Sequence, residues 1–163
     1  MTENYFITTN TVPETQSPLH TIYTRDGHII FAGFGEYSGV IRAFHKQTHR
    51  TDSPTPKNCS LSDIKKMLLA AAGTPFQKKV WSAVKNVPRG TVTTYGQLAE
   101  AIGKPTAVRA VGTALGCNPI SYFIPCHRVV RASHNMSDRT QGYRWGSAIK
   151  HDIIRYEGKF INA

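Results

Sequence analysis

Ile124-Pro125-Cys126-His127-Arg128-Val129-Val130 places a thiol, an imidazole and a guanidinium side by side, behind a proline and in front of a branched apolar pair. The flanking apolar residues predict that Cys126 is held at the edge of a core. A nucleophilic cysteine needs that setting, because the thiolate is the reactive species and a neighbouring base or positive charge lowers the thiol pKa. Taken alone, the heptapeptide more often marks a small buried cysteine without a chemical role. The rest of the sequence is needed to distinguish a nucleophilic cysteine from a buried structural one.

The neighbouring histidine suggests how a thiol proton would leave. In an extended segment the side chains of Cys126 and His127 point to opposite faces, so direct contact is not guaranteed. A bridging water would relay the proton, and a carboxylate behind the histidine would orient its ring. Of the ten acidic residues, Glu157 is the best placed, because the last predicted helix would return past Cys126. The alternative is that Glu157 is an exposed residue at a helix end.

Two helix start signals precede this stretch. Thr74-Pro75-Phe76-Gln77 and Thr94-Tyr95-Gly96-Gln97 each place a threonine three residues before a glutamine, which is the pattern of a capping box. The second box predicts a helix that runs through Ile102, and after the turn at Lys104-Pro105 another helix is predicted over residues 106–115. Two short helices joined by a tight turn are typical of a helix-turn-helix.

The second of these two helices has an unusual composition. A helix that reads base edges in the major groove normally carries several long polar side chains. Here Arg109 is the only charged residue, and the side predicted to be exposed is lined with small residues. Such a helix could approach the narrower minor groove closely and project one arginine. The alternative is that the small residues only allow two helices to pack. They are Ala107, Ala110, Gly112, Thr113 and Ala114.

The first 72 residues predict a small lobe that contains a sheet. Asp26-Gly27 lies between apolar segments and predicts a tight hairpin with arms over residues 22–24 and 28–34. Helices are predicted over residues 37–48 and 61–72, with a linker of turn formers and prolines over residues 51–58. Beyond Cys126 we expect a polar loop over residues 131–142 and a last helix over residues 147–158 that Ser147 caps.

These elements predict an α/β (α+β) fold in two parts. The N-terminal lobe covers residues 1–72, with a linker near residues 51–60. A mainly helical domain over residues 73–163 carries the helix-turn-helix and the Cys126 segment.

The charge of the chain predicts an acidic partner. Lys and Arg number 20 against 10 Asp and Glu, a net charge of +10. Nucleic acid is the first candidate and a membrane surface the second, although no apolar run approaches the roughly 20 residues of a spanning helix. The polar start Met1-Thr2-Glu3-Asn4 lacks a secretory signal. We therefore expect the cytoplasm, or the nucleus if the source is a eukaryote.

The cysteines and histidines do not predict a metal site. Cys59, Cys117 and Cys126 lack the spacing of zinc or redox motifs, and buried structural thiols are the default for the first two. His45 and His49, four residues apart, could bind a metal on a helix face, but no third ligand is evident. We expect no metal and no cofactor.

Residues 74–158 closely resemble the O6-alkylguanine-DNA alkyltransferases, also called methylated-DNA-protein-cysteine methyltransferases. The most specific element is Pro125-Cys126-His127-Arg128 in this order after a helix-turn-helix. The other matching pieces are Gly73 to Gln77, Val80-Trp81, Thr94-Tyr95, Leu98-Ala99, Ile102-Gly103, Arg109 to Gly112, Asn118-Pro119, Gly142 to Gly146, Lys150 and Glu157-Gly158.

The resemblance implies a role for each matching residue. Cys126 resembles the thiolate that takes the alkyl group from guanine O6 in a direct and irreversible displacement. His127 resembles the base that acts through water, and Glu157 the acid that orients it. Tyr95 is similar to the tyrosine that assists charge development on the departing guanine. The family also acts on O4-alkylthymine, needs no cofactor and works as a monomer on duplex DNA.

The resemblance implies further residues at the DNA and around the base. Arg109 resembles the finger that fills the space of a flipped base, with Thr94, Tyr95, Ala107, Ala110 and Gly112 beside the minor groove. Asn118 resembles the hinge between the recognition helix and the active-site segment. The backbone carbonyls of Cys126 and Val129 would accept hydrogen bonds from the guanine 2-amino group. Tyr143, Arg144 and Trp145 would line the pocket.

Two other classes of protein share parts of this pattern. A non-catalytic sensor of DNA lesions would use the same helix-turn-helix without alkyl transfer. A cysteine hydrolase would use Cys126 and His127, but it would leave the small-residue helix with Arg109 without a purpose.

Overall fold

The computed structural model describes residues 5–159, except for the side chains of Met136 and Ser137. The described chain forms two compact units, and the fold is the mixed α/β type that we predicted. One unit contains the described residues up to Ala72 together with Pro119–Phe123, and the other contains Gly73–Asn118 and the described residues from Ile124 onward. Within residues 5–159, no helix combines the length and apolarity needed to cross a membrane.

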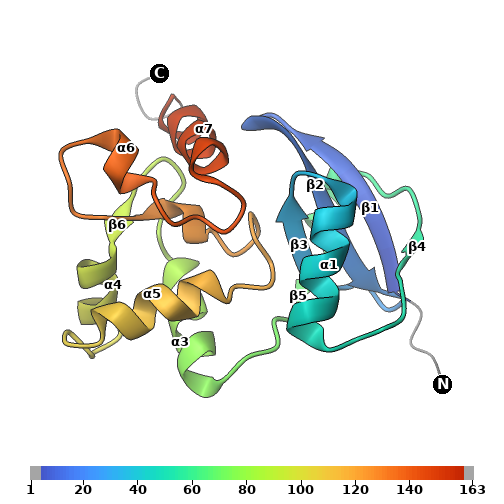
Figure 1. Cartoon of the computed structure of the whole chain (residues 1–163), viewed down its shortest axis with the longest axis horizontal. Helices are drawn as coiled ribbons and strands as arrows, with labels where there is room; N and C mark the ends of the chain where they lie inside the picture. The colour runs from blue at the N-terminus through green and yellow to red at the C-terminus, as the bar shows by residue number, and fades with distance from the viewer. Residues whose placement is uncertain (1–4, 160–163) are drawn as a thin grey trace. The chain divides into compact units, whose positions relative to one another are not determined.

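A five-stranded sheet forms the first unit (Figure 1). The strand order is β4-β1-β2-β3-β5, with antiparallel pairing in the centre and a short parallel strand at each edge. The strands are β1 (Tyr5–Val12), β2 (Thr15–Thr24), β3 (His28–Phe34), β4 (Thr55–Pro56) and β5 (Leu68–Leu69).

The predicted hairpin and the first predicted helix are confirmed. Gly27 adopts a φ of +82° at the turn between β2 and β3, where its N–H donates to Thr24 O at 3.0 Å. Helix α1 (Tyr37–Thr48) lies along one face of the sheet (Figure 1). Its buried Phe44 packs edge-on against Phe31, with ring centroids 5.7 Å apart.

Two predictions for this unit are wrong. The helix expected over residues 61–72 ends after one turn, as α2 (Leu61–Ile64), and Leu68 and Leu69 form an edge strand that pairs with His28 and Ile29. The expected linker over residues 51–58 contains β4, which pairs with Phe6 and Ile7 of β1. In both places unpaired backbone groups of a sheet edge bind the passing chain.

The segment Pro119–Phe123 departs from the predicted two-part division of the sequence. Ala32 N–H of β3 donates to Pro119 O at 2.9 Å, and Ser121 N–H donates back to Ala32 O at 3.2 Å. Tyr122 adopts a φ of +75°, and its hydroxyl donates to the buried carboxylate of Glu14 at 3.1 Å. The chain between the helix-turn-helix and Cys126 therefore belongs to the sheet unit.

The second unit begins with three helices, and both capping boxes are confirmed. Thr74 caps α3 and Thr94 caps α4, each through its side chain and the glutamine three residues later. Trp81 joins α3 to α5, because its indole N–H donates to Ala114 O at 2.9 Å. A Cβ on Gly73 would lie 2.5 Å from the Trp81 ring, so only glycine fits there. The helices are α3 (Pro75–Val84), α4 (Tyr95–Ala101) and α5 (Val108–Gly116).

The rest of this unit carries Cys126. A 3-10 turn, η1 (Cys126–Arg128), leads into β7 (Val129–Val130), which pairs in parallel with β6 (Thr93–Thr94) just ahead of α4. The expected loop over residues 131–142 contains a short helix, α6 (Met136–Arg139). The last helix is α7 (Ser147–Gly158), and Gly146 rather than Ser147 is its N-cap, with no side-chain cap.

Candidate active site

Cys126 begins a turn and not the extended segment that we expected. In a 3-10 turn, with three residues per turn, successive side chains diverge by about 120°. The side chains of Cys126 and His127 accordingly contact different partners, Asn118 and Glu157. The premise of an extended segment was wrong, although the two side chains do point apart. Any proton transfer between them needs an intermediary.

Asn118 holds the thiol in place. Its amide Nδ2 donates to Ile124 O at 3.0 Å and to Cys126 Sγ at 3.1 Å, and the whole side chain is buried. The residue directly follows the C-cap of α5. One amide therefore ties the end of the second helix of the helix-turn-helix to the sulfur and to the backbone ahead of it. A hydrogen bond from an amide to sulfur favours the thiolate over the thiol.

Glu157 lies behind His127, as the sequence suggested, and it is buried rather than exposed. Its Oε1 lies 3.1 Å from His127 Nε2. Arg128 donates to the same carboxylate twice, from Nε to Oε2 at 3.0 Å and from Nη2 to Oε1 at 2.8 Å. A third bond, from Arg128 Nη1 to Val87 O at 3.0 Å, fixes the guanidinium.

The two members of this pair have different charges. Burial alone would raise the pKa of Glu157, but hydrogen bonds from His127 and Arg128 outweigh it and lower the pKa to about 2. Burial lowers the pKa of His127 below its usual value, against the pull of Glu157. The carboxylate is therefore ionised and the imidazole neutral at pH 7.

That charge state determines the tautomer of His127. A carboxylate can only accept, so the Nε2 atom facing Glu157 must carry the proton. The other ring nitrogen, Nδ1, is then an unprotonated acceptor, and it is buried without a hydrogen-bond partner among residues 5–159. A buried ring nitrogen without a proton is a group that can accept one in a proton relay.

Burial raises the pKa of the Cys126 thiol, and several groups oppose that rise. They are the Asn118 amide, the cation of Lys150, the backbone and the cation of Arg144. Lys150 is itself buried, and its Nζ donates to Val129 O at 2.6 Å. Burial lowers the pKa of Lys150 to about 8, which leaves it mostly charged at pH 7.

Tyr95 is the first residue of α4 and lies in the same site. The β6–β7 pairing of Thr93 and Thr94 with Val129 and Val130 fixes the start of α4 against the Cys126 segment. Burial raises the pKa of Tyr95, and the charge of Cys126 raises it further. The phenol therefore keeps its proton and can donate it.

The aromatic rings around Lys150 include two predicted site residues. Lys150 Nζ lies 5.9 Å from the Tyr95 ring centroid and 6.0 Å from that of Tyr143. The ammonium group of Lys150 thus lies close to both rings. The Val129 carbonyl expected to bind a base already accepts from Lys150, and the Cys126 carbonyl accepts from Val129 N–H. Each carbonyl keeps a second lone pair.

The predicted exposed side of α5 is exposed only in part, because Ala107 and Gly112 are half-buried. Arg109, Ala110 and Thr113 are exposed, but Ala114 is only 2% exposed because it faces α3. Gly112 lies against the Tyr95 ring, since a Cβ there would be 3.7 Å from Cδ1. One flank of α5 therefore adjoins the active site.

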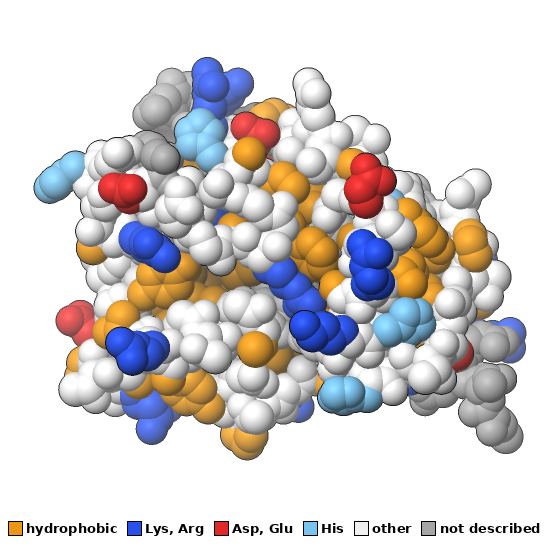
Figure 2. Space-filling model, in the orientation of Figure 1, with side chains coloured by type: hydrophobic (Ala, Val, Ile, Leu, Met, Phe, Trp, Pro, Cys, Tyr) orange, Lys and Arg blue, Asp and Glu red, His pale blue; other side chains and the backbone are white. Residues whose placement is uncertain are grey.

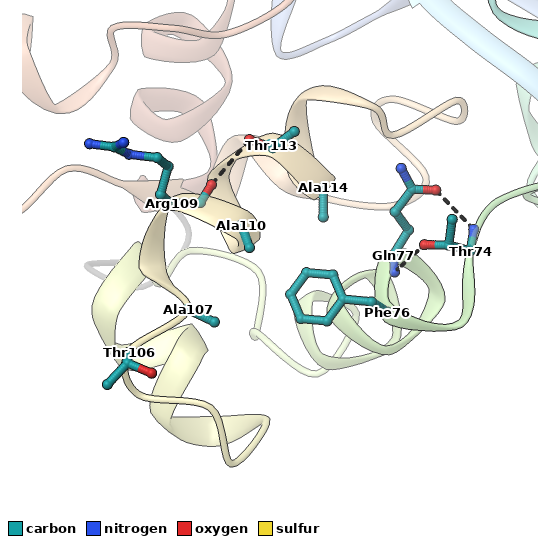
Figure 3. A pocket seen from close by; sticks show the side chains of 9 residues that line it. All are labelled: Thr74, Phe76, Gln77, Thr106, Ala107, Arg109, Ala110, Thr113 and Ala114. Atoms are coloured by element: carbon teal, nitrogen blue, oxygen red, sulfur yellow. Dashed lines mark hydrogen bonds between the residues drawn. The ribbon is translucent and has the colours of Figure 1, made fainter.

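The other flank of α5 borders a groove of about 630 Å³ (Figure 3). Phe76 of α3 points across it toward Ala107 and Ala110, whereas the Arg109 side chain extends away from Phe76. The backbone N–H groups of Thr74 and Gln77, at the start of α3, are already used, because each donates to the side chain of the other residue. Arg109 thus projects from a helix that borders a largely apolar groove.

No cluster of candidate metal ligands is found within the described part of the chain. None of its histidines, cysteines and carboxylates group in threes as a metal site requires. His45 Nδ1 lies 2.7 Å from Arg50 O instead of facing His49.

Sequence reasoning missed two residues of this site. The sequence motif assigned no role to Arg128, although its position directly after Cys126 and His127 could have indicated that it belongs to the site. Lys150 was noted only as a matching residue. Its position three residues before the buried Ile153 on the last helix could have indicated that it faces inward.

Sequence comparisons relate the chain to known proteins. Residues 75–159 match the family model "6-O-methylguanine DNA methyltransferase, DNA binding domain". A methylated-DNA--protein-cysteine methyltransferase of Shigella flexneri is 46% identical over 102 residues, which cover 63% of this chain and 57% of that protein. One of the same name from Methanosarcina acetivorans is 47% identical over 90 residues, 55% of each chain. The matches thus span little more than half of these relatives.

Solved structures resemble a larger part of the chain. The O6-methylguanine methyltransferase of Mycobacterium tuberculosis superposes with a TM-score of 0.72 at 27% identity, over 95% of this chain and 93% of that one. A crystal structure of that protein in complex with DNA gives 0.72 at 27% identity, over 94% and 93%.

The Glu157 carboxylate should make the free energy of unfolding depend on pH in the acid range. Its pKa of about 2 in the folded chain lies below the ordinary value of 4.5. The stabilisation is therefore complete above pH 4.5 and is lost as the pH falls toward 2. We expect the free energy of unfolding, measured with urea from pH 5 to pH 2.5, to fall more steeply for the wild type than for Glu157→Gln.

Asp152→Asn is the matched control, because it removes an exposed carboxylate from the same helix. It should keep the steep wild-type profile. Equal slopes for the wild type and Glu157→Gln would contradict the assignment of an ionised buried carboxylate.

Proposed function

Because the chain belongs to the 6-O-methylguanine DNA methyltransferase family, through the domain matched at residues 75–159, we propose that it repairs DNA by direct reversal. It transfers the alkyl group of O6-alkylguanine, and of O4-alkylthymine, to Cys126 in a single turnover. The observation that carries the proposal is a buried thiol held by Asn118 at 3.1 Å, next to a neutral His127 bound to Glu157.

The transfer is a direct displacement. The Cys126 proton passes through one water to His127 Nδ1, and the sulfur attacks the alkyl carbon. A C–S bond forms while the bond from carbon to O6 breaks, and the electron pair stays on the guanine. Tyr95, whose phenol keeps its proton, donates toward the negative charge that develops on the base. The product is a thioether that nothing in the chain cleaves, so each molecule reacts once.

Access to the lesion requires base flipping. A base inside a duplex cannot present its O6 substituent to a thiol that is 8% exposed, so it has to leave the stack at a cost of a few kcal/mol. Helix α5 enters the minor groove with the small residues Ala110 and Gly112 and with Ala107, its N-cap, and Arg109 takes the place of the base. Thr94 and Tyr95, at the start of α4, contact the same strand.

The flipped base binds between Cys126 and the segment ahead of α7. Its 2-amino group donates to the remaining lone pairs of the Cys126 and Val129 carbonyls. Tyr143, Arg144 and Trp145 line the pocket, and the Arg144 guanidinium lies 5.0 Å from the Trp145 ring centroid. Asn118 positions the sulfur for attack.

The partner is double-stranded DNA, bound by a monomer without a cofactor, in the cytoplasm or nucleus. Lys and Arg side chains are spread over the face shown in Figure 2 rather than gathered in one patch. A net charge of +10 attracts the phosphate backbone at any sequence and speeds the encounter. Binding should accordingly weaken as the salt concentration rises.

The test is to mix the chain with duplex DNA that carries labelled O6-methylguanine and to determine the mass of the protein. We expect one added methyl group, mapped to Cys126, together with unmodified guanine in the DNA. Cys126→Ala should bind the duplex but gain no mass. Binding by the wild type without a mass change would instead indicate a lesion sensor, and neither binding nor transfer would leave a cysteine hydrolase to be tested.

Arg109→Ala should separate flipping from chemistry. The variant should transfer methyl groups from duplex DNA at least tenfold more slowly than the wild type, because the vacated stack is no longer filled. Its rate with the free base O6-methylguanine should be unchanged. Single-turnover rates on both substrates give the comparison.

Lys85→Ala is the control, since it removes one exposed positive charge from the end of α3. It should affect duplex repair only slightly. If Arg109→Ala slowed both substrates equally, the arginine would not act in base flipping.

A further inference from the structure

Before the thiol proton is transferred, the basic residues next to Cys126 do not supply a positive charge that favours the thiolate. His127 is neutral, and the hydrogen on its Nε2 points to Glu157. Arg128 is committed to the same carboxylate through two hydrogen bonds and to Val87 O through a third. The charge of Arg128 is thus balanced by Glu157. Cys126 is only 8% exposed, so a cation that favours its ionisation before the proton transfer has to come from elsewhere in the fold.

Lys150 is one such cation, but its ammonium group also interacts with groups other than Cys126. Its Nζ donates to Val129 O at 2.6 Å and lies near the rings of Tyr95 and Tyr143. Burial lowers its pKa to about 8, so part of its charge is lost in the alkaline range where a buried thiol ionises. A cation that keeps its charge over the whole range would be more effective.

Arg144 keeps its positive charge over the whole pH range and lies at the same site. Its Nη1 donates to the Asn118 carbonyl at 3.5 Å, while the Asn118 amide contacts Cys126 Sγ at 3.1 Å. Its guanidinium lies 5.0 Å from the Trp145 ring centroid, which restricts where it can move. The side chain is half-buried, so its field is only partly screened by water. An arginine does not lose its proton at any pH used for proteins.

We propose that Arg144 is a thiolate-stabilising residue, held by Trp145 and by the Asn118 carbonyl so that its permanent charge favours the ionised form of Cys126. Arg144 thereby adds to Lys150 a charge that the neutral His127 and the paired Arg128 do not supply before the proton is transferred. The proposal deepens the proposed function, because it concerns the nucleophile of the same reaction. Arg144 then does more than line the pocket for the base.

Other groups that face this site act on the same equilibrium. Tyr95 interacts with the charge of Cys126 and with Arg131. Arg131 also acts on Lys150, and Cys117 acts on Arg144. None of these interactions is altered directly by replacing the arginine head group with a neutral one, except that between Arg144 and Cys117.

The test measures the ionisation of Cys126 without DNA. The wild type and two uncharged variants, Arg144→Gln and Arg144→Met, are treated with iodoacetamide from pH 5 to pH 10. The rate is followed at the peptide that contains Cys126, so that Cys59 and Cys117 do not contribute. We expect the apparent thiol pKa to rise by about one unit in both variants, so that the rate at a pH below that value falls about tenfold.

Two controls separate charge from packing. Arg144→Lys keeps the charge and should retain most of the wild-type pH profile. Arg155→Gln removes an exposed arginine from α7 and should leave the profile unchanged. Thermal unfolding of every variant shows which ones are folded, and either uncharged variant alone is sufficient for the comparison.

The outcomes distinguish this proposal from the proposed function. Unchanged profiles in Arg144→Gln or Arg144→Met, in a protein whose wild type accepts a methyl group from DNA, would overturn the role of Arg144 and leave alkyl transfer standing. A shifted profile in a protein that accepts no methyl group would support the role of Arg144 and count against the function. An equal shift in Arg144→Lys would mean that shape, not charge, matters.

Discussion

The buried carboxylate of Glu157 is the group on which the rest of the active site depends. It is shared by His127 and Arg128, which follow the nucleophile directly in the sequence. Arg128 balances its charge, which allows a carboxylate to stay ionised in the interior. Because the carboxylate only accepts, it holds His127 as the neutral tautomer with a free Nδ1. One ion pair between α7 and the Cys126 turn thus sets both the position and the basicity of the histidine.

Much of the fold could be predicted where a signal is local. The capping boxes at Thr74 and Thr94 and the Asp26-Gly27 turn satisfy backbone groups within a few residues, so they act the same way in any context. The failures concern the sheet edges. Leu68 and Leu69 have helical spacing with their neighbours, but β3 offers them unpaired hydrogen-bonding groups from 40 residues away. The local sequence does not indicate that pairing with β3 will compete with helix formation.

The site was predictable in its components and less so in its contacts. The motif and the resemblance identified Cys126, His127, Glu157 and Asn118 as candidates, and the structure brings these four together. The sequence could not show that Arg128 forms an ion pair with Glu157, because that pair depends on how α7 packs. The same packing buries Lys150, a lysine that sequence statistics would place in solvent. Charges near a thiolate therefore had to be assigned from the structure.

The central claim is that His127 is neutral, with its proton on Nε2 and a free Nδ1. Nitrogen-15 NMR of histidine-labelled protein at pH 7, with His127→Gln to assign the resonance, measures both ring nitrogens directly. The account predicts a protonated Nε2 and an unprotonated Nδ1 that persist well below pH 6.5. A His127 that is doubly protonated at pH 7, or that carries its single proton on Nδ1, would contradict it.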